Sequence, residues 1–208
     1  MRTIIVQPPF VQLNAPYPSA YYLKSFFASR GEEARVFDAS LSLILRIFSP
    51  EGLERVFTDA EAVFSHKQNS FSKEAVFQIK RYLSQRDQYK DSICIVLSVL
   101  SGRGAEYAHF LSENLVLPFG YRMDRYLEES KPLGVSDDAL SLASLCMEDI
   151  ADLITVLLDH EFSLIRYGES KAVSQRSFDE ILKSMDSSYV LPNFYEPVLD
   201  EYFAEFSS

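Results

Sequence analysis

The chain has 208 residues, 47% of them hydrophobic and 24% charged, which suits a folded protein with one large domain or two small ones. Acidic residues outnumber basic ones by 30 to 20, and the resulting net charge of −10 repels phosphate backbones and anionic lipid. We therefore expect neither nucleic acid nor a membrane as a partner. The longest apolar run, at residues 93–100, is too short to span a bilayer. The N-terminus lacks a signal-peptide pattern, so we expect a cytoplasmic protein.

Two short apolar runs near the N-terminus predict β-strands, at Thr3–Gln7 and Ala34–Asp38. Between them, Ser19–Ser29 carries apolar side chains at helical spacing, and Gly31 is a typical stop signal after a helix. A strand, a helix and a second strand form a βαβ unit. Its strands are expected to be adjacent and parallel, joined by a right-handed crossover.

Strand signals stop after Asp38, and we expect every long segment beyond residue 40 to be helical. Residues 93–100 are ambiguous, because a short apolar-rich run also suits a buried strand. We favour a helix that begins near Tyr89 and ends at Gly102. Residues 117–132 are interpreted as loop-rich. Further helices are predicted from Ser49 towards Val63 and over residues 72–84, 105–113 and 137–159. Another helix should begin at the capping box formed by Ser177 and Glu180, and a final helix should end at Phe206.

These elements predict a mostly helical α/β fold. A βαβ unit at residues 1–40 starts an incomplete Rossmann-like sheet, and a large helical insertion or subdomain occupies residues 41–208. Two parallel strands alone make a marginal sheet with two open edges. Either helices cover these edges or further strands follow beyond residue 208.

Signatures of catalysis are absent from the sequence, which contains no Gly-rich phosphate loop and no C-x-x-C, H-E-x-x-H or G-x-S-x-G motif. His66, His109 and His160 lie on different segments without ligand spacing, so we interpret them as surface or capping residues. Cys94 and Cys146 lie inside apolar stretches and are interpreted as small buried hydrophobic residues. We predict no catalytic residue, no metal site and no bound cofactor in this chain itself.

A long loop follows the first predicted strand and is the first candidate site. Parallel α/β sheets bind ligands outside the carboxyl ends of their strands, which is where this loop leaves. A loop of this length is typical of a functional or interface segment, or alternatively of a proline-rich cover over a sheet edge. Its candidate cofactor-binding residues are Pro8, Pro9, Phe10, Gln12, Asn14, Tyr17 and Ser19.

Asp38 ends the second predicted strand, at the position that binds ribose in dinucleotide folds. The chain has no G-x-G-x-x-G motif, so helix capping or turn formation is the favoured role for Asp38.

Asp149 is the second candidate. The helix at residues 137–159 has one narrow polar stripe, and nearly all other positions are apolar. The stripe consists of Ser141, Ser144, Glu148, Asp152, Thr155 and Asp159. Asp149 lies about 100° off this stripe, on the apolar wall, where a carboxylate needs a partner. Arg166 is the nearest basic residue downstream, and we predict a structural ion pair between Asp149 and Arg166. Asp152, on the stripe, should be the more exposed of the two aspartates.

Several stretches of the sequence also occur together in a known family. The N-terminal part contains IIVQPPF at residues 4–10, YPSAYYLKSFFASRG at residues 17–31 and VFDAS at residues 36–40. This opening resembles that of radical S-adenosylmethionine (SAM) proteins with a cobalamin-binding domain. The stretch ASLCMEDIADLI at residues 143–154, with Phe162, RYGE at residues 166–169 and SFD at residues 177–179, is similar to a helical insertion in a long-chain branch of that superfamily.

The resemblance covers nearly the whole chain and implies a parent protein that uses cobalamin, SAM and a [4Fe–4S] cluster. It also implies that this chain is only the N-terminal, non-catalytic part. The C-x-x-x-C-x-x-C cluster motif, the third strand and the barrel of the family are missing, and two cysteines cannot supply three clustered thiolates. The D-x-H-x-x-G loop that supplies a lower axial histidine to cobalamin is also absent. The expected partner is the remainder of the parent polypeptide, which would carry the radical SAM barrel and any enzyme activity.

An alternative reading assigns a different class of function. The chain would then be a stand-alone acidic helical module for protein interaction, with a βαβ unit that is purely structural. A small-molecule-binding regulator that uses the loop at residues 8–19 is a third possibility. The reading frame beyond codon 208 distinguishes the first two readings.

Overall fold

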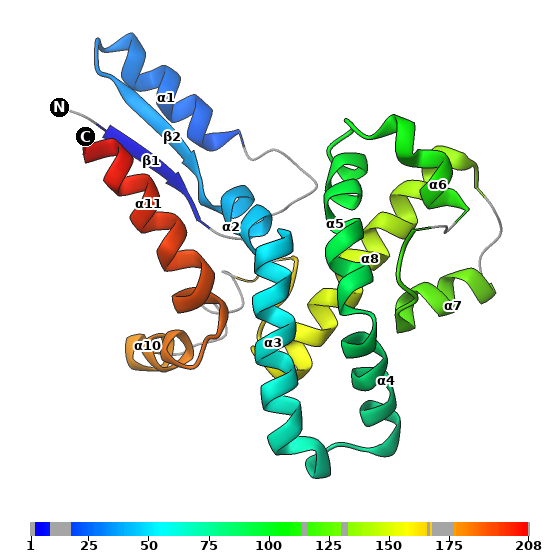
Figure 1. The fold of residues 1–208 in the computed structure, drawn as a ribbon. Helices are drawn as coiled ribbons and strands as arrows, with labels where there is room; N and C mark the ends of the chain where they lie inside the picture. Colours follow the sequence, from blue (N-terminus) through cyan, green and yellow to red (C-terminus); the bar gives the residue numbers. More distant parts are fainter. Residues whose placement is uncertain are drawn as a thin grey trace. The chain divides into compact units, whose positions relative to one another are not determined.

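A computed structural model describes residues 3–8, 18–113, 116–129, 133–165, 167 and 177–207. The fold is mostly helical with one two-stranded parallel sheet, as predicted (Figure 1). The chain forms two compact units: unit 1 comprises Met1–Arg46 and Glu161–Ser208, and unit 2 comprises Ile47–His160. The helical unit 2 is thus inserted between two parts of unit 1. The predicted division at residue 40 groups the chain differently, because it leaves the C-terminal helices out of the βαβ unit.

The bounds of the elements are as follows. Unit 1 contains β1 (Thr3–Gln7), α1 (Ser19–Ser29), β2 (Ala34–Asp38), α2 (Ala39–Ile47, whose last residue is counted in unit 2), α10 (Phe178–Asp186), the π-helical turn η3 (Leu191–Tyr195) and α11 (Glu196–Ser207). Unit 2 contains α3 (Pro50–Lys67), η1 (Gln68–Ser70), α4 (Lys73–Ser84), α5 (Arg86–Leu100), η2 (Ala105–Tyr107), α6 (Ala108–Ser112), α7 (Tyr121–Glu129) and α8 (Val135–Leu157).

The two strands of unit 1 pair in parallel, which confirms the predicted βαβ unit. Thr3 lies opposite Ala34 in the register, and Gln7 lies opposite Asp38. Helix α1 connects the strands and ends with Gly31 at a φ of 76°, a left-handed conformation that favours glycine. The predicted helix stop at this glycine is therefore confirmed.

Helix α11 packs on the sheet through an aromatic pair. The Tyr202 ring stacks on the Phe37 ring of β2, with 3.9 Å between centroids and 12° between planes. Val198 and Ala39 belong to the same apolar cluster as Phe37. Figure 1 shows the sheet between α1 and α11, so the two helices cover opposite faces. The sequence pattern predicted the final helix but not the sheet face that it covers.

Helix α11 runs antiparallel to the two strands. Val198, in its first turn, packs beside the end of β2. Two turns later, the Phe206 ring lies 5.5 Å from the guanidinium of Arg35, near the start of β2. The chain therefore returns along α11 from the carboxyl edge of the sheet to its amino edge.

Unit 2 has a core formed by α3, α5 and α8. Its fully buried side chains include Leu53, Val56 and Phe57 on α3, Tyr89, Ile93 and Val96 on α5, and Leu142, Ala143 and Cys146 on α8. Residues 93–100 are helical within α5, as favoured from the sequence. The interpretation of Cys94 as a buried residue is wrong, because Cys94 is exposed on this helix, whereas Cys146 is buried. Ser49 caps α3 by accepting the N–H of Gly52 at 2.9 Å, and Ser72 caps α4 by accepting the N–H of Ala75 at 3.1 Å. The predicted cap at Ser49 is therefore confirmed, as is the one at Ser177, whose hydroxyl accepts the N–H of Glu180 at 3.3 Å.

The loop-rich interpretation of residues 117–132 is wrong for α7, which is helical over nine residues. Met123 of α7 is buried, while Arg122 and Arg125 are exposed. The short apolar stripe of α7 is too weak a signal without its partner helix, because a short isolated helix is marginal in water.

Helix α8 matches the predicted segment closely. Ser144, Glu148 and Asp152 are only half-buried, whereas most other positions are buried. The predicted polar stripe is thus confirmed at these three positions, whereas Asp159 at its end is buried. Of the helices that the structure describes, none is both long and apolar enough to cross a bilayer.

The stack between Phe37 and Tyr202 gives a test of unit 1. Tyr202→Ala should lower the free energy of unfolding by about 2 kcal/mol, because it removes an aromatic contact and its apolar burial. Tyr202→Phe keeps the ring and should stay within about 0.5 kcal/mol of the natural protein. Urea unfolding followed by circular dichroism measures both. Equal losses for the two variants would contradict the stacking role.

Candidate functional site

The predicted loop lies where parallel sheets place ligands, but most of it falls outside the described residues. Pro8 follows β1 and Ser19 begins α1, and both are exposed. Gln7, at the carboxyl end of β1, is buried. The candidate residues Pro9, Phe10, Gln12, Asn14 and Tyr17 lie outside the described residues, so their role stays a prediction.

Asp38 caps the helix that follows its strand. Its Oδ1 accepts the N–H of Leu41 at 2.9 Å, and its backbone carbonyl accepts the Ser42 hydroxyl at 2.8 Å. This is the hydrogen-bond pattern of an N-cap, here for α2. The capping role favoured from the sequence is confirmed.

Asp149 is fully buried, with 0% of its surface exposed, as its place on the apolar wall of α8 predicts. The side chain of Asp152 is 37% exposed, so the predicted order of the two aspartates is also confirmed. Arg166 lies outside the described residues, and the ion pair between Asp149 and Arg166 stays a prediction. Within the described residues, Asp149 Oδ1 accepts the Tyr82 hydroxyl at 3.0 Å and the backbone N–H of Arg122 at 3.1 Å.

The carboxylate of Asp149 caps α7 from a distant helix. The Gly120 carbonyl accepts the N–H of Asp124 at 3.1 Å, which puts Gly120 at the N-cap position of α7. Glycine has no side chain that could accept a free N–H of the first helical turn. Asp149 Oδ1 accepts the N–H of Arg122 in its place. A Cβ on Gly120 would lie 1.8 Å from Asp149 Oδ2. Glycine at this position therefore makes room for the capping carboxylate.

The buried setting changes the acidity of Asp149. Burial raises the pKa of its carboxyl group to about 6, against the lowering effect of the hydrogen bonds from Arg122 N–H and Tyr82. Among the described residues, Asp149 Oδ2 has no hydrogen-bond partner. Because the folded pKa exceeds the unfolded one, the protonated carboxyl group stabilises unit 2. That contribution is fully present below the model-peptide pKa and is lost as the pH rises through about 6.

The surroundings of Asp149 are also titratable. Burial raises the pKa values of Tyr82, Tyr89 and Cys146, and the charge of Asp149 raises them further. These groups are therefore protonated near neutral pH.

Three further sets of polar contacts hold α7 and Phe119, which lies two residues before it. The Arg122 guanidinium donates to Asp152 at 2.6 and 2.9 Å and to Glu148 at 3.0 Å. Arg81 of α4 forms a two-pronged ion pair with Asp124.

Gln85 completes the set by pairing with the backbone of Phe119. The Gln85 amide donates to the Phe119 carbonyl at 3.0 Å, and the Phe119 N–H donates to Gln85 Oε1 at 2.7 Å. The sequence reasoning missed this whole cluster. A glycine followed by a short amphipathic segment, at residues 120–129, is the signal that could have indicated it.

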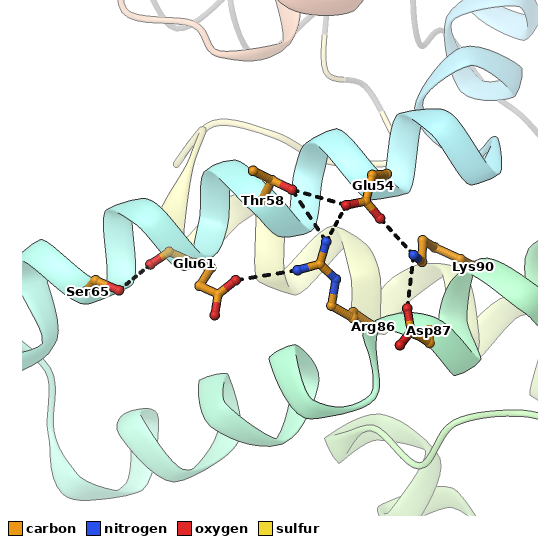
Figure 2. Close-up of polar contacts among 7 residues, drawn as sticks. All are labelled: Glu54, Thr58, Glu61, Ser65, Arg86, Asp87 and Lys90. Atoms are coloured by element: carbon orange, nitrogen blue, oxygen red, sulfur yellow. Dashed lines mark hydrogen bonds and ion pairs between the residues drawn. The ribbon is translucent and has the colours of Figure 1, made fainter.

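The ion-pair network between α3 and α5 is the other polar cluster of unit 2 (Figure 2). Lys90 Nζ lies 2.7 Å from Glu54 and 2.9 Å from Asp87, and Arg86 pairs with Glu54 and Glu61. The hydrogen bond from Lys90 is the main cause that lowers the pKa of Glu54. The cations and carboxylates of this network pair with one another on the surface, which gives a structural rather than a ligand-binding role.

Within the described residues, no group of three or more histidine, cysteine or carboxylate side chains could hold a metal ion. No protein-family model, curated protein or solved structure matches the chain.

The cap on α2 is tested by Asp38→Ala, which should lower the free energy of unfolding by about 1 kcal/mol. Asp38→Asn keeps an oxygen that can accept the N–H of Leu41, so it should cost only a few tenths of a kcal/mol. Thermal unfolding of the two variants measures the difference. A loss of similar size in both variants would mean that the negative charge, rather than the cap, is important.

The contact between Gly120 and Asp149 is tested by a double-mutant cycle. Gly120→Ala should destabilise unit 2 by about 2 kcal/mol, because the new methyl group overlaps a buried carboxylate. In an Asp149→Ala background the same change should cost less than about 0.5 kcal/mol, since the overlap is gone. Urea unfolding of the four proteins gives the coupling energy. A coupling energy near zero would refute the close approach.

Proposed function

We propose that this chain is the non-catalytic N-terminal part of a cytoplasmic, cobalamin-type radical SAM protein. Its βαβ unit would begin a parallel sheet that the remainder of the parent polypeptide completes. The observation that carries the proposal is the course of α11, which covers the face opposite α1 and returns the chain to the amino edge of the sheet. A helix in this position is what a crossover to another parallel strand requires.

The handedness of crossovers indicates where such a strand would lie. Parallel strands are joined by right-handed crossovers in nearly all proteins. Helix α1 leads from β1 to β2 on one face, whereas α11 lies on the other. A right-handed crossover on that second face leads in the opposite direction, from β2 back past β1. The next strand would therefore pair with the free edge of β1.

The composition of the two strands supports the same edge. β1 has Ile4, Ile5 and Val6 in succession, so apolar side chains point to both faces, as in the interior strands of parallel sheets. β2 contains the exposed Arg35, and a charge of this kind is common on edge strands. Among the described residues, β1 pairs with β2 and with no other strand. An added strand beside β1 would bury apolar surface and satisfy its free backbone groups.

Helix α1 also carries apolar surface that two strands do not cover. Tyr22, Leu23 and Phe26 are 74%, 48% and 50% exposed, and Ala20 is its buried side chain. Added strands and their helices would cover part of this surface.

In this proposal the chain supplies only part of a cobalamin site. Two strands supply only one flank of the crevice at the carboxyl edge, where the predicted loop at residues 8–19 begins. The opposing flank would come from the rest of the parent, as would the cysteines for an iron–sulfur cluster and the SAM site. In this proposal the chain contributes one wall of the cobalamin and substrate side of the parent.

A stand-alone interaction module is the second candidate, and α10 favours it. Phe178, Leu182 and Met185 are spaced along one helix face and are 71%, 43% and 46% exposed. An apolar stripe of this kind on an acidic helix is typical of a protein-binding surface.

The test is to read the gene beyond codon 208 and to express the longer protein. We expect a short β-branched apolar strand soon after residue 208 and a C-x-x-x-C-x-x-C motif further on. A stop codon at that point would refute the proposal and support the interaction module.

Cobalamin binding is the matched measurement. In a visible-spectrum titration with hydroxocobalamin, residues 1–208 alone should show no tight binding, and the longer protein should bind. Micromolar or tighter binding by residues 1–208 alone would contradict the view that the crevice is half-formed.

A further inference from the structure

Helix α7 is held on unit 2 mainly by polar contacts. Met123 is its buried side chain, whereas Tyr121 and Leu127 are exposed. Tyr126 is half-buried. The polar attachments include the ion pairs of Arg122 and Asp124 and the hydrogen bond to Asp149. Elements with few buried apolar contacts open at low free energy compared with the core of a domain. The docking of α7 should therefore respond to changes in charge.

Among the residues that the structure describes, Asp149 is the attachment whose charge is least compensated. The charged and titratable groups around it are Arg81 and Tyr82 on α4, Tyr89 on α5, Arg122 on α7, and Cys146, Glu148 and Asp152 on α8. The described cations near Asp149 bind other carboxylates: Arg81 pairs with Asp124, and Arg122 pairs with Glu148 and Asp152. A buried carboxylate without its own cation costs free energy when it is ionised.

We propose that ionisation of Asp149 controls the docking of α7, so that α7 is closed when this carboxyl group is protonated and opens more often when it is ionised. In the closed state, Oδ1 accepts the N–H of Arg122 and the hydroxyl of Tyr82 in either protonation state, whereas Oδ2 has no described partner. Opening of α7 removes the cover of residues 120–122 and lets water reach the carboxylate. Ionisation therefore favours the open state.

The opening would change a surface groove of unit 2. Between α7 and α8 lies a cavity of about 360 Å³. Its lining consists of Tyr121, Arg122, Arg125 and Glu129 from α7 and Leu145 and Asp152 from α8. Because most of these side chains belong to α7, the groove would exist in this form only while α7 is docked. The protonation of Asp149 would thus regulate the shape of this groove.

The size of the effect follows from the two protonation equilibria. The pKa of Asp149 is about 6 in the closed state and returns towards 3.8 when water reaches the side chain. Between about pH 5 and about pH 7.5, the equilibrium constant for opening should then rise about tenfold. The raised pKa means that closure is strongest in acid and weakens as the pH rises through about 6.

Hydrogen exchange followed by mass spectrometry tests the proposal on the whole chain. Exchange is compared at about pH 5 and about pH 7.5, after correction for the intrinsic rate, on peptides from α7 and from α5. We expect the protection of α7 amides to fall about tenfold at the higher pH, while α5 amides change little. No change in α7, or an equal change in α5 that indicates global unfolding, would overturn the proposal.

Two variants at matched positions of α8 complete the test. Asp149→Asn keeps an oxygen for the cap but cannot ionise, so its α7 protection should no longer depend on pH. Asp152→Asn removes a half-exposed carboxylate that binds the same arginine, and it should keep the dependence of the natural protein. A pH dependence that persists in Asp149→Asn would refute the proposal.

A titration of the natural protein gives an independent decision if Asp149→Asn does not fold. The carboxyl carbon of Asp149 is followed by NMR, and we expect a midpoint near 6. A midpoint below about 4.5 would overturn the proposal, because the closed state would then not favour the protonated form.

Discussion

The stacking of Tyr202 on Phe37 determines how unit 1 can be extended. A parallel strand pair has two faces and two edges to cover, and α1 covers only one face. The stack places α11 on the second face and, with the contact between Phe206 and Arg35, fixes its direction along the strands. Right-handed crossovers then leave the free edge of β1 as the place for a further strand. The position of α11, set by this aromatic contact, therefore determines at which edge of the sheet the proposed function expects a further strand.

Local signals predicted most of the elements. Ser49 and Ser72 act as caps, Gly31 ends α1, and Asp38 caps α2, because each of these effects depends on residues only a few positions apart. Non-local packing could not be read in the same way. The loop-rich interpretation failed at α7, since that helix depends on contacts with α4 and α8 rather than on its own sequence.

At the candidate site, the burial of Asp149 could be predicted from its own helix, but its hydrogen-bond partners could not. The helical spacing of α8 correctly indicated that Asp149 is buried and Asp152 is not. Its described partners, Tyr82 and Arg122, lie 67 and 27 residues away in the sequence. Reasoning from the nearest downstream arginine could not find them. The requirement for glycine at residue 120 appears only when α7 is seen against α8.

The two units separate two kinds of physical constraint. In unit 1, β1 has no second strand partner among the described residues, and α1 has exposed apolar side chains. In unit 2, α3, α5 and α8 form a separate core. The described hydrogen bonds of Asp149 join it to α4 and α7 of the same unit. Neutralising Asp149 should therefore alter α7 without changing the edge that β1 offers. A helical insertion with its own core can respond to its surroundings while the sheet keeps its register.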